Sequence, residues 1–386
     1  MPARIMLGAD LVPTEKNYQY FKGGDAECLV GTEILKKLNS ADFTIFNLEV
    51  PLTDKKEPIE KCGPNLVAPT DTIRGLKAIN PYFFTLANNH ILDQGVQGLD
   101  STITILEKAG IAYAGAGINL KEAQKPYVVT VNGIKVGIYC CAEHEFTIAT
   151  ENEAGANPFD PLESLDHVCN LRNQCDFVIV LYHGGKEHYR YPSPDLQKVC
   201  RKLVEKGADL VVCQHSHCIG AQEEWKKGRI IYGQGNFLFD HSESEYWQTS
   251  LLLELSLEKN SGEITADIIF HPLVKCGDTV RLAEKDKKKQ ILSEFEERSK
   301  IILDPENVQK EYQLFANLML ESYLSSFSGS WSRKFIYRVI NKLSGYRFSK
   351  CRLKKLYLKK EKLAIQNIIE CEAHRELVLK GLKCDR

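Results

Sequence analysis

The hydrophobic pattern of the first 220 residues alternates between short apolar runs and segments with helical spacing. The apolar runs are rich in Val, Ile, Leu and Phe and have the length of buried strands. They lie at residues 3–10, 43–49, 82–90, 176–185 and 209–217, and the third continues into a polar loop. The helical segments lie between them, at residues 31–39, 99–110 and 195–207. Strands that alternate with helices predict an α/β fold in which helices flank the sheets.

Two stretches depart from this alternation. Residues 127–142 contain two β-rich runs separated by Asn132–Gly133, which predicts a hairpin because both residues tolerate positive φ. Residues 229–275 form β-rich runs joined by tight turns, and this part is expected to be antiparallel. From residue 281 onward Lys, Glu and Leu dominate and predict several helices. We therefore expect one domain at 1–280 and a basic, mainly helical C-terminal extension at 281–386.

Charge is distributed unevenly along a chain whose net charge is only −1. Residues 331–386 hold 16 Lys/Arg against 5 Asp/Glu, a net of +11, so residues 1–330 carry −12. Within this segment, residues 331–343 and 350–363 interleave Lys and Arg with Leu, Ile and Tyr. Such stretches bind anionic membrane surfaces or partner proteins, and a helical cap with a solvated basic face is the simpler interpretation. Nucleic-acid binding is not favoured, because no recognised motif accompanies the charge.

The composition predicts a location in the cytoplasm, with the inner face of the membrane as a peripheral site. The start of the chain has one Arg and a short apolar run that Asp10 interrupts, which is unlike a signal peptide. No stretch approaches the roughly 20 apolar residues of a membrane-spanning helix. The thirteen cysteines are scattered without a paired CxxC motif, which favours reduced thiols.

Residues that can bind metal ions stand at the ends of five predicted strands. The set consists of Asp10, Glu49, Asn89, His90, His183, His215 and His217. In α/β sheets, functional groups gather outside the carboxyl ends of the strands. Taken singly, each residue has an ordinary explanation as a helix cap, a turn residue or a core histidine. Their common placement favours a site for Mn, Fe, Zn or Mg, because carboxylate, amide and imidazole groups suit these ions.

Residues 211–220, VVCQHSHCIG, place two of these histidines between two cysteines. Alone, the stretch is compatible with a metal site, a redox pair or a polar turn after a buried strand. Cys213 lies inside the apolar run and is expected in the core, and Cys218 has no second thiol pair nearby to complete a zinc site. The i, i+2 spacing predicts that His215 and His217 face one cavity, so the histidines and not the cysteines are expected to bind metal.

Seven motifs, taken together in their order, resemble the CapA family of capsule or poly-γ-glutamate biosynthesis proteins. This family is a branch of the calcineurin-like metallophosphoesterase superfamily. The motifs are GAD (8–10), NLEVPLT (47–53), LANNHILDQG (86–95), GIAYAGAG (110–117), LYHGGKEHYRYPSPDLQ (181–197), GADLVVCQHSH (207–217) and IIYGQGNFLFD (230–240). The resemblance covers residues 4–240 and implies a metallophosphoesterase-like β-sandwich flanked by helices.

The resemblance also implies one or two divalent metal ions and a role for each matching residue. Asp10 and His217 would bind the first metal, and Glu49 would bridge both metals. The second metal would be bound by Asn89, His183 and His215.

Further roles follow from the same motifs for residues around the metals. His90 would face the substrate as a proton donor or a ligand of a phosphoryl oxygen, and Asp93 would orient it, with a helix N-cap as the alternative for Asp93. Glu187, Gln197 and Asn236 would line the pocket or support the ligands. Ordinary surface or turn positions remain the alternatives for these three residues.

The motifs depart from the family patterns at three positions, and two functions stay open. His183-Gly184-Gly185 stands where many relatives have HWG. Asp10-Leu11-Val12 replaces Asp-x-His, so one ligand of the first metal is missing, and Gln214 replaces the Gly of Gly-His-x-His. One expectation is a metal-dependent phosphoesterase-like hydrolase, acting on a phosphoester or an anionic polymer precursor in capsule, exopolysaccharide or poly-γ-glutamate biosynthesis. The alternative is a non-catalytic, metal-binding accessory or scaffold subunit of a polymer-synthesis complex.

Overall fold

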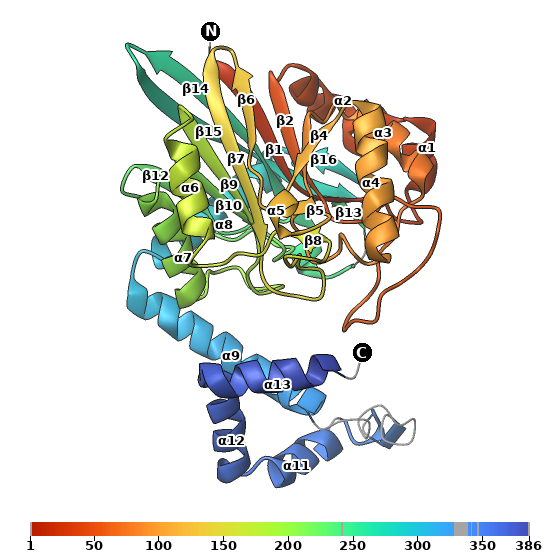
Figure 1. Cartoon of the computed structure of the whole chain (residues 1–386), viewed down its shortest axis with the longest axis vertical. Coiled ribbons are helices and arrows are strands. Elements are labelled where there is room, and N and C mark those ends of the chain that lie inside the picture. The colour runs from red at the N-terminus through yellow and green to blue at the C-terminus, as the bar shows by residue number, and fades with distance from the viewer. Residues whose placement is uncertain (1, 241, 328–338, 341, 346, 385–386) are drawn as a thin grey trace. The chain divides into compact units, whose positions relative to one another are not determined.

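A computed structural model describes residues 2–240, 242–327, 339–340, 342–345 and 347–384 (Figure 1). The chain divides into two compact units, residues 1–309 and residues 310–386. The first unit contains two mixed β-sheets, and the second is helical in its described part.

Eight strands form the larger sheet of the first unit. They are β1 (Ala3–Val12), β2 (Phe43–Leu48), β3 (Phe83–Thr85), β4 (Ala112–Ala114), β13 (Asn236–Phe239), β14 (Thr249–Asn260), β15 (Glu263–Cys276) and β16 (Thr279–Leu282). Their order is β16-β15-β14-β1-β2-β3-β4, and β13 also pairs with β1. Strands β1 to β4 are parallel, and so is the β1–β13 pair. The carboxyl ends of β1, β2 and β3 therefore lie at one edge of the sandwich.

Six strands form the smaller sheet. They are β6 (Tyr127–Val131), β7 (Ile134–Ala142), β9 (Phe177–His183), β10 (Leu210–Gln214), β11 (Gln222–Trp225) and β12 (Gly228–Ile231), in the order β11-β12-β10-β9-β7-β6. The parallel strands β7, β9, β10 and β12 form its centre. A two-stranded ladder of β5 (Ala116–Gly117) and β8 (Gly155–Ala156) lies outside both sheets.

Three hydrophobic cores stack the first unit into a helix–sheet–sheet–helix sandwich. Side chains alternate along β1, so Ile5 and Leu7 enter the core between the sheets while Met6 faces the helices. Helices α1 (Tyr18–Gly23), α2 (Ala26–Asn39), α3 (Ile73–Ala78) and α4 (Gly95–Ala109) cover the larger sheet. Helices α6 (Ser164–Arg172) and α7 (Pro194–Glu205) cover the smaller sheet, and the short α5 (Leu120–Ala123) lies by the β5–β8 ladder (Figure 1). This architecture confirms the predicted α/β sandwich flanked by helices.

Several predicted elements have different limits in the structure. The predicted strand at 82–90 is a strand only from Phe83 to Thr85, because the following asparagines pair with side chains and carbonyls rather than with a ladder. Two strands of the region predicted to be antiparallel, β12 and β13, pair parallel with β10 and β1, and this part of the prediction is wrong. The predicted hairpin is present between β6 and β7, with φ of 46° at Asn132 and 81° at Gly133.

Helix α8 (Lys285–Ile301) belongs to the first compact unit, although it follows the domain boundary predicted at residue 280. Ile291 and Phe295 are buried in the core between the sheets. Arg298 Nε donates a 2.9 Å hydrogen bond to the carbonyl of Gly220. The first compact unit extends to Gln309, beyond α8, because the apolar face of this helix packs into the sandwich. The domain limits predicted from the sequence stay a prediction.

The second unit contains most of α9 (Pro305–Phe327), α11 (Arg347–Leu356), α12 (Lys359–Glu370) and α13 (Glu372–Cys384). The predicted basic stretch at 350–363 lies on α11 and α12, whereas most of 331–343 lies outside the described residues. In the part of the chain that the structure describes, no helix is both long and apolar enough to cross a bilayer.

Candidate metal centre

The predicted metal ligands of the larger sheet follow its parallel strands. Asp10 lies near the end of β1, Glu49 directly follows β2, and Asn89 lies in the loop after β3. The backbone can approach closely here because Gly8 is glycine: a Cβ at this position would lie 2.3 Å from Cδ1 of Phe46. The loops at this edge therefore bring two carboxylates and an amide side chain to one place.

The smaller sheet contributes histidines from two neighbouring strands. His183 ends β9, beside Gln214 at the end of β10. His215 and His217 follow in a turn with φ of 86° and 54°, values that non-glycine residues adopt rarely and at an energetic cost. This backbone lets both histidines face the strand ends of the other sheet, with 6.0 Å between their ring centroids.

These residues form two groups that share one carboxylate. Glu49, His183 and His215 form the first group, and Asp10, Glu49 and His217 form the second. Within each group one ligand atom from every residue lies within 4.8 Å of the others. All five side chains are buried, none being more than 7% exposed. Glu49 is common to both groups, and His215 and His217 lie in different groups; the metal-binding roles of these residues stay predictions.

The carboxylate oxygens at the centre of the two groups fit a pair of cations. Both oxygens of Glu49 and Oδ2 of Asp10 are buried without a hydrogen bond in the described structure. His183 Nε2 lies 3.4 Å from Glu49 Oε1, and His217 Nδ1 lies 3.5 Å from Asp10 Oδ2. Unsatisfied buried charge is costly and is normally paired or bound to metal, so the donor set suits divalent metal ions.

Amide side chains orient the ligands. Asn47 donates from Nδ2 to Asp10 Oδ1 at 2.8 Å and lies 3.2 Å from His183 Nδ1. Asn88 donates in turn to Asn47 Oδ1 at 3.0 Å. Asn236, which is in register with Asp10 on β13, places its Oδ1 2.9 Å from His217 Nδ1. These contacts fix the rings and the carboxylate before any ion binds.

Asn89 and Glu145 extend the first group toward solvent. Asn89 Oδ1 lies 3.0 Å from His183 Nε2, and its Nδ2 donates to Glu145 Oε2 at 3.3 Å. Glu145 Oε1 also lies 4.0 Å from His215 Nε2, and the Glu145 side chain is 39% exposed. Glu145 was not predicted, since its sequence context, EHEF, has no metal-site spacing.

His90 is held on one side by Asp93. Its Nδ1 lies 2.6 Å from Asp93 Oδ2, which leaves Nε2 as the nitrogen available to a substrate. The His90 backbone N–H donates to Asn88 Oδ1 at 3.1 Å. Asp93 is fully buried, and it also accepts the backbone N–H of Leu66 and the ammonium of Lys61. The contact of Asp93 with His90 supports an orienting role for this carboxylate.

The charges of the cluster shift the pKa values of its members. Burial would raise the pKa of Asp10, but His217, His183 and Asn47 hold it below its ordinary value. Burial opposes protonation of His183 and His217, yet Glu49 and Asp10 raise both pKa values, that of His217 to about 9. The pKa of His215 falls well below its ordinary value because of burial and the neighbouring histidines. The carboxylates thus create a strongly negative centre that attracts cations, including protons.

The other predicted pocket residues lie in different surroundings. Gln197 is buried on α7 and donates to the carbonyl of Ile302 at 3.0 Å, so its amide holds the end of α8. Glu187 is exposed beside His188, whose Nε2 accepts a 2.8 Å hydrogen bond from Trp247. The Trp247 ring lies 4.5 Å from that of His217. The pocket roles of Glu187 and Gln197 stay predictions, and Trp247 is a neighbour of the site that the sequence did not reveal.

The cysteines beside the two histidines are both buried. Cys213 is buried, with its Sγ 3.6 Å from that of Cys200, and no disulfide joins the cysteines in the described part of the chain. Burial raises the pKa of Cys218 to about 11. Neither cysteine is a member of the two ligand groups, and the metal-binding role of the histidines stays a prediction.

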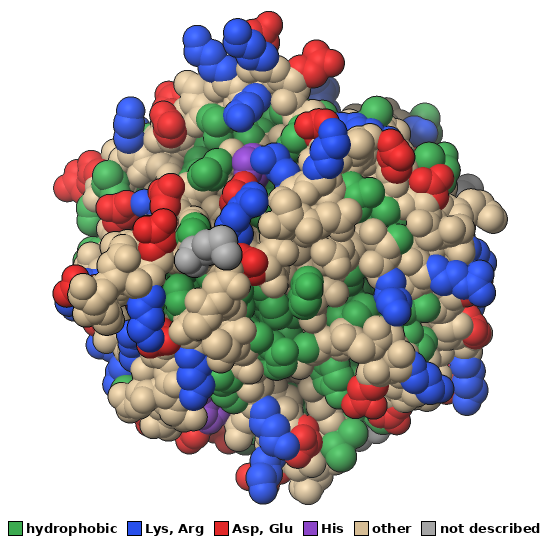
Figure 2. All heavy atoms as spheres, turned by 90° about the horizontal axis from the view of Figure 1, so that it is seen from above, with side chains coloured by type: hydrophobic (Ala, Val, Ile, Leu, Met, Phe, Trp, Pro, Cys, Tyr) green, Lys and Arg blue, Asp and Glu red, His purple; other side chains and the backbone are tan. Residues whose placement is uncertain are grey.

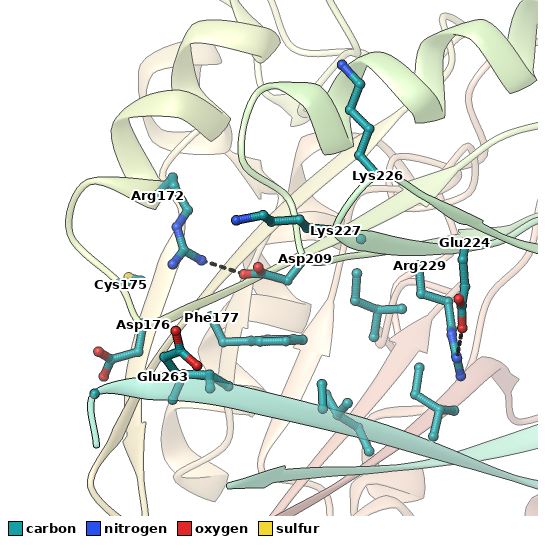
Figure 3. Close-up of a pocket in the computed structure, with 17 residues that line it drawn as sticks. Arg172, Cys175, Asp176, Phe177, Asp209, Glu224, Lys226, Lys227, Arg229 and Glu263 are labelled. Carbon is teal, nitrogen blue, oxygen red and sulfur yellow. Dashed lines mark hydrogen bonds and ion pairs between the residues drawn. The ribbon is translucent and has the colours of Figure 1, made fainter. Parts of the chain in front are cut away.

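A cavity of about 710 Å³ lies at the opposite end of the sandwich, near the starts of β9, β10 and β12 (Figure 3). Four of its charged side chains form two ion pairs: Arg172 contacts Asp209, and Arg229 contacts Glu224. Figure 2, which views that end, shows both signs of charge around hydrophobic side chains. Among the described residues, neither group of potential metal ligands lines this cavity, so the candidate site is the metal centre at the other edge.

The two-sheet sandwich and the ligand groups at its strand ends define an α/β protein with a candidate metal centre. A family model described as "Bacterial capsule synthesis protein PGA_cap" matches residues 4–241. The chain belongs to this family of bacterial capsule synthesis proteins.

Two relatives illustrate the match. The chain is 30% identical over 241 residues to the capsule biosynthesis protein CapA of Bacillus anthracis, covering 60% of this chain and 58% of that protein. It is 28% identical over 225 residues to the PGA biosynthesis protein CapA of Bacillus subtilis (strain 168), covering 57% and 59%. The match therefore spans less than two thirds of each relative's own length.

Solved structures show more distant similarities. A phosphatase from Mycoplasma pneumoniae has a TM-score of 0.42 and 15% identity, covering 70% of this chain and 94% of that one. A 5'-nucleotidase precursor from Thermus thermophilus has a TM-score of 0.39 and 14% identity, covering 76% and 58%. These similarities are too distant to bear on the activity of this chain.

Proposed function

We propose that this protein is a metal-dependent phosphoesterase-like hydrolase in capsule, exopolysaccharide or poly-γ-glutamate biosynthesis. The observation that carries the proposal is the pair of ligand groups that share Glu49, whose two carboxylate oxygens are buried and accept no hydrogen bond in the described structure. Family membership supports the biosynthetic setting. The substrate class that suits the site is a phosphoester or a phosphorylated precursor of an anionic polymer.

The ligand residues would bind two divalent ions. Asp10 and His217 would hold one divalent ion, His183 and His215 with Asn89 would hold the other, and Glu49 would contact both. Such ions supply positive charge that stabilises a phosphoryl group, and they activate water as a nucleophile. We propose Mn, Fe, Zn or Mg, because the ligands are oxygen and imidazole nitrogen.

His90 would act on the leaving group. With its proton on Nδ1, His90 would donate a hydrogen bond to Asp93 Oδ2, which fixes the ring and directs Nε2 away from Asp93. When the ring carries both protons, Nε2 would give its proton to the departing oxygen and leave a neutral ring with Nδ1–H on Asp93, a role that suits imidazole near neutral pH. Asn236 and Asn47 would keep His217 and Asp10 in place during this step.

The non-catalytic accessory role remains the second candidate, because one observation favours it. Val12, at the position of the missing His, is 2% exposed and pairs with Phe239 in the β1–β13 ladder. The second group therefore lacks a protein ligand that the superfamily pattern includes. A weakly occupied or purely structural metal site would follow from this loss.

One experiment separates the two candidates. Purified protein is expected to contain bound Mn, Fe or Zn and to cleave an aryl phosphate or an aryl phosphodiester. Asn89→Ala and His183→Ala should each lower turnover at least ~10²-fold, whereas His374→Ala, on an exposed position of α13, should not. Full activity in either site variant overturns the hydrolase proposal. Less than one ion per chain, with no turnover across a broad phosphate panel, favours the accessory role.

The location in the cytoplasm also remains a proposal. The observation that supports it is the unbonded thiol pair Cys200 and Cys213, whose sulfur atoms lie 3.6 Å apart in the core. Neighbouring thiols persist without oxidation in a reducing compartment. Fractionation of cells that express the native chain tests this, and recovery outside the cytoplasmic and inner-membrane fractions would contradict it.

A further inference from the structure

The loop between β2 and α3 places a buried lysine beside the candidate centre. The side chain of Lys61 is only 3% exposed, and its Nζ forms an ion pair with Asp93 Oδ1. Nζ also lies 3.3 Å from the Asn89 carbonyl and 3.3 Å from His90 Nδ1. A lysine is rarely buried to this extent unless its charge has a partner, so the contact requires an explanation.

The same loop is attached to the Asp93 turn at several further points. Leu66 N–H donates to Asp93 Oδ2 at 2.5 Å, and Ile59 N–H donates to the Asp93 carbonyl at 3.1 Å. Gln94 Oε1 accepts from the N–H of Glu57 at 2.8 Å, and Gln94 Nε2 donates to the Leu66 carbonyl at 3.0 Å. Lys61 is therefore one part of a connection that holds both carboxylate oxygens of Asp93.

We propose that Lys61 is a positioning residue for His90 and acts through Asp93. The inference rests on the proposed function, in which His90 Nε2 faces the substrate. Lys61 holds Oδ1 of Asp93, so Oδ2 stays directed at His90 Nδ1, 2.6 Å away. With the carboxylate unable to rotate, the imidazole keeps Nδ1–H toward Asp93 and Nε2 toward the site.

Both the charge of Lys61 and its hydrogen bonds contribute to this positioning role. Asp93 is fully buried, and a buried carboxylate without a cation is strongly destabilising. In the proposed tautomer His90 Nδ1–H donates to Asp93 Oδ2 and cannot accept from Lys61, so the lysine protons are directed to Asp93 Oδ1 and the Asn89 carbonyl. Lys61 thus neutralises Asp93 without taking His90 as its acceptor.

Kinetics of matched variants test the proposal. Lys61→Met keeps the length of the side chain but removes its charge, and should lower kcat ~10- to 100-fold while KM changes less than about two-fold. Lys61→Arg keeps a cation beside Asp93 and should recover part of the loss. Lys55→Met, in an exposed part of the same loop, is the control and should leave kcat unchanged. Bound metal should be equal in all four proteins.

NMR of His90 gives a measurement that does not depend on turnover, so the role of Lys61 can be tested separately from the proposed hydrolase function. In long-range ¹H–¹⁵N NMR spectra, the His90 signals, assigned by their loss in His90→Gln, should show the proton on Nδ1 in the wild type. Lys61→Met should shift them toward mixed tautomers, and Lys61→Arg and Lys55→Met should not. If the wild type hydrolyses nothing, the proposed function fails and the NMR result alone decides the role of Lys61.

Three outcomes overturn the inference. The first is unchanged His90 signals in folded Lys61→Met, and the second is a loss of bound metal in step with any loss of turnover. The third outcome applies if Lys61→Met does not fold, in which case Lys61→Arg is the deciding variant. Loss of the His90 Nδ1–H signal in folded Lys61→Arg would then exclude positioning by the cation.

Discussion

At the scale of single residues, Glu49 is the side chain on which both ligand groups depend. Glu49→Gln replaces a shared anionic oxygen by an amide nitrogen or oxygen, and we expect metal affinity to fall at least ~10-fold. Bound metal is measured by elemental analysis after dialysis. As a second measure, Mn²⁺ should raise the melting temperature of the wild type by mass action and leave that of Glu49→Gln nearly unchanged.

Glu258→Gln provides the matched control, because Glu258 is an exposed acidic residue of β14 near the start of β1, away from the ligand groups. Its metal content and its response to Mn²⁺ should equal those of the wild type. Metal retained by Glu49→Gln at the wild-type level would contradict the shared-ligand arrangement.

The cysteines give a second prediction at this scale. Burial raises the pKa of Cys140 to about 12, so almost no thiolate is present at neutral pH, while Cys62 and Cys276 are exposed. A thiol reagent should label Cys62 and Cys276 within minutes and leave Cys140 unmodified in the native protein. Mass mapping with and without denaturant measures this. Rapid native labelling of Cys140 would show that the core between the sheets opens easily.

Residue types at strand ends predicted much of the candidate site, because each ligand follows an apolar run that is recognisable by itself. Asp10 and His183 are examples, since both lie at the ends of strands buried on both faces. Lys61 could not be predicted in this way. It lies in a polar loop, and only the folded path of that loop brings its ammonium to Asp93. Asn47 was part of a recognised motif, but its bridge between Asp10 and His183 requires both sheets.

At the scale of elements, α8 closes the sandwich and should contribute strongly to its stability. Phe295 is 1% exposed in the core between the sheets and packs against Phe270 with ring centroids 5.0 Å apart. Phe295→Ala should lower the free energy of unfolding by ~3–5 kcal/mol. Denaturant unfolding followed by tryptophan fluorescence measures the change. Phe327→Ala, an exposed phenylalanine on α9, should cost far less.

Truncation tests the role of the same helix without a substitution. A chain that ends at residue 309 should unfold at the same denaturant concentration as the first unit of the full chain. A chain that ends at 280 should be less stable, because it exposes the apolar surface that Ile291 and Phe295 cover. Equal stability of the two truncated chains would support the boundary predicted at 280.

The local periodicity of the sequence predicted which segments form strands. It was less successful in predicting how those strands pair. The apolar runs of β9 and β10 are continuous because both faces of the smaller sheet are covered, which makes them visible in the sequence. The pairing of β13 with β1 joins segments more than 220 residues apart. No periodicity encodes such a partner, so the region after residue 229 was assigned a uniform antiparallel arrangement, which β12 and β13 contradict.

At the scale of the whole molecule, the second unit combines basic charge with exposed apolar side chains. Leu363, Leu377 and Leu382 are 52%, 71% and 66% exposed, and α11 and α12 carry lysines and arginines. We propose that this unit binds an anionic membrane surface, because interfacial helices combine these two features. A solvated basic helical surface and a partner protein are the competing interpretations.

Vesicle co-sedimentation distinguishes these interpretations. The full chain should pellet with vesicles that contain anionic lipid, much less with neutral vesicles, and less again as salt rises, since each basic residue near the surface contributes ~1 kcal/mol. A chain that ends at residue 309 should stay in the supernatant. Replacing Lys354 and Lys355 by Glu should weaken binding of the full chain, whereas the same change at the exposed Lys287 and Lys289 of α8 should not. Binding that survives truncation would reject the membrane role of the second unit, because the charge that causes it would then lie in the sandwich.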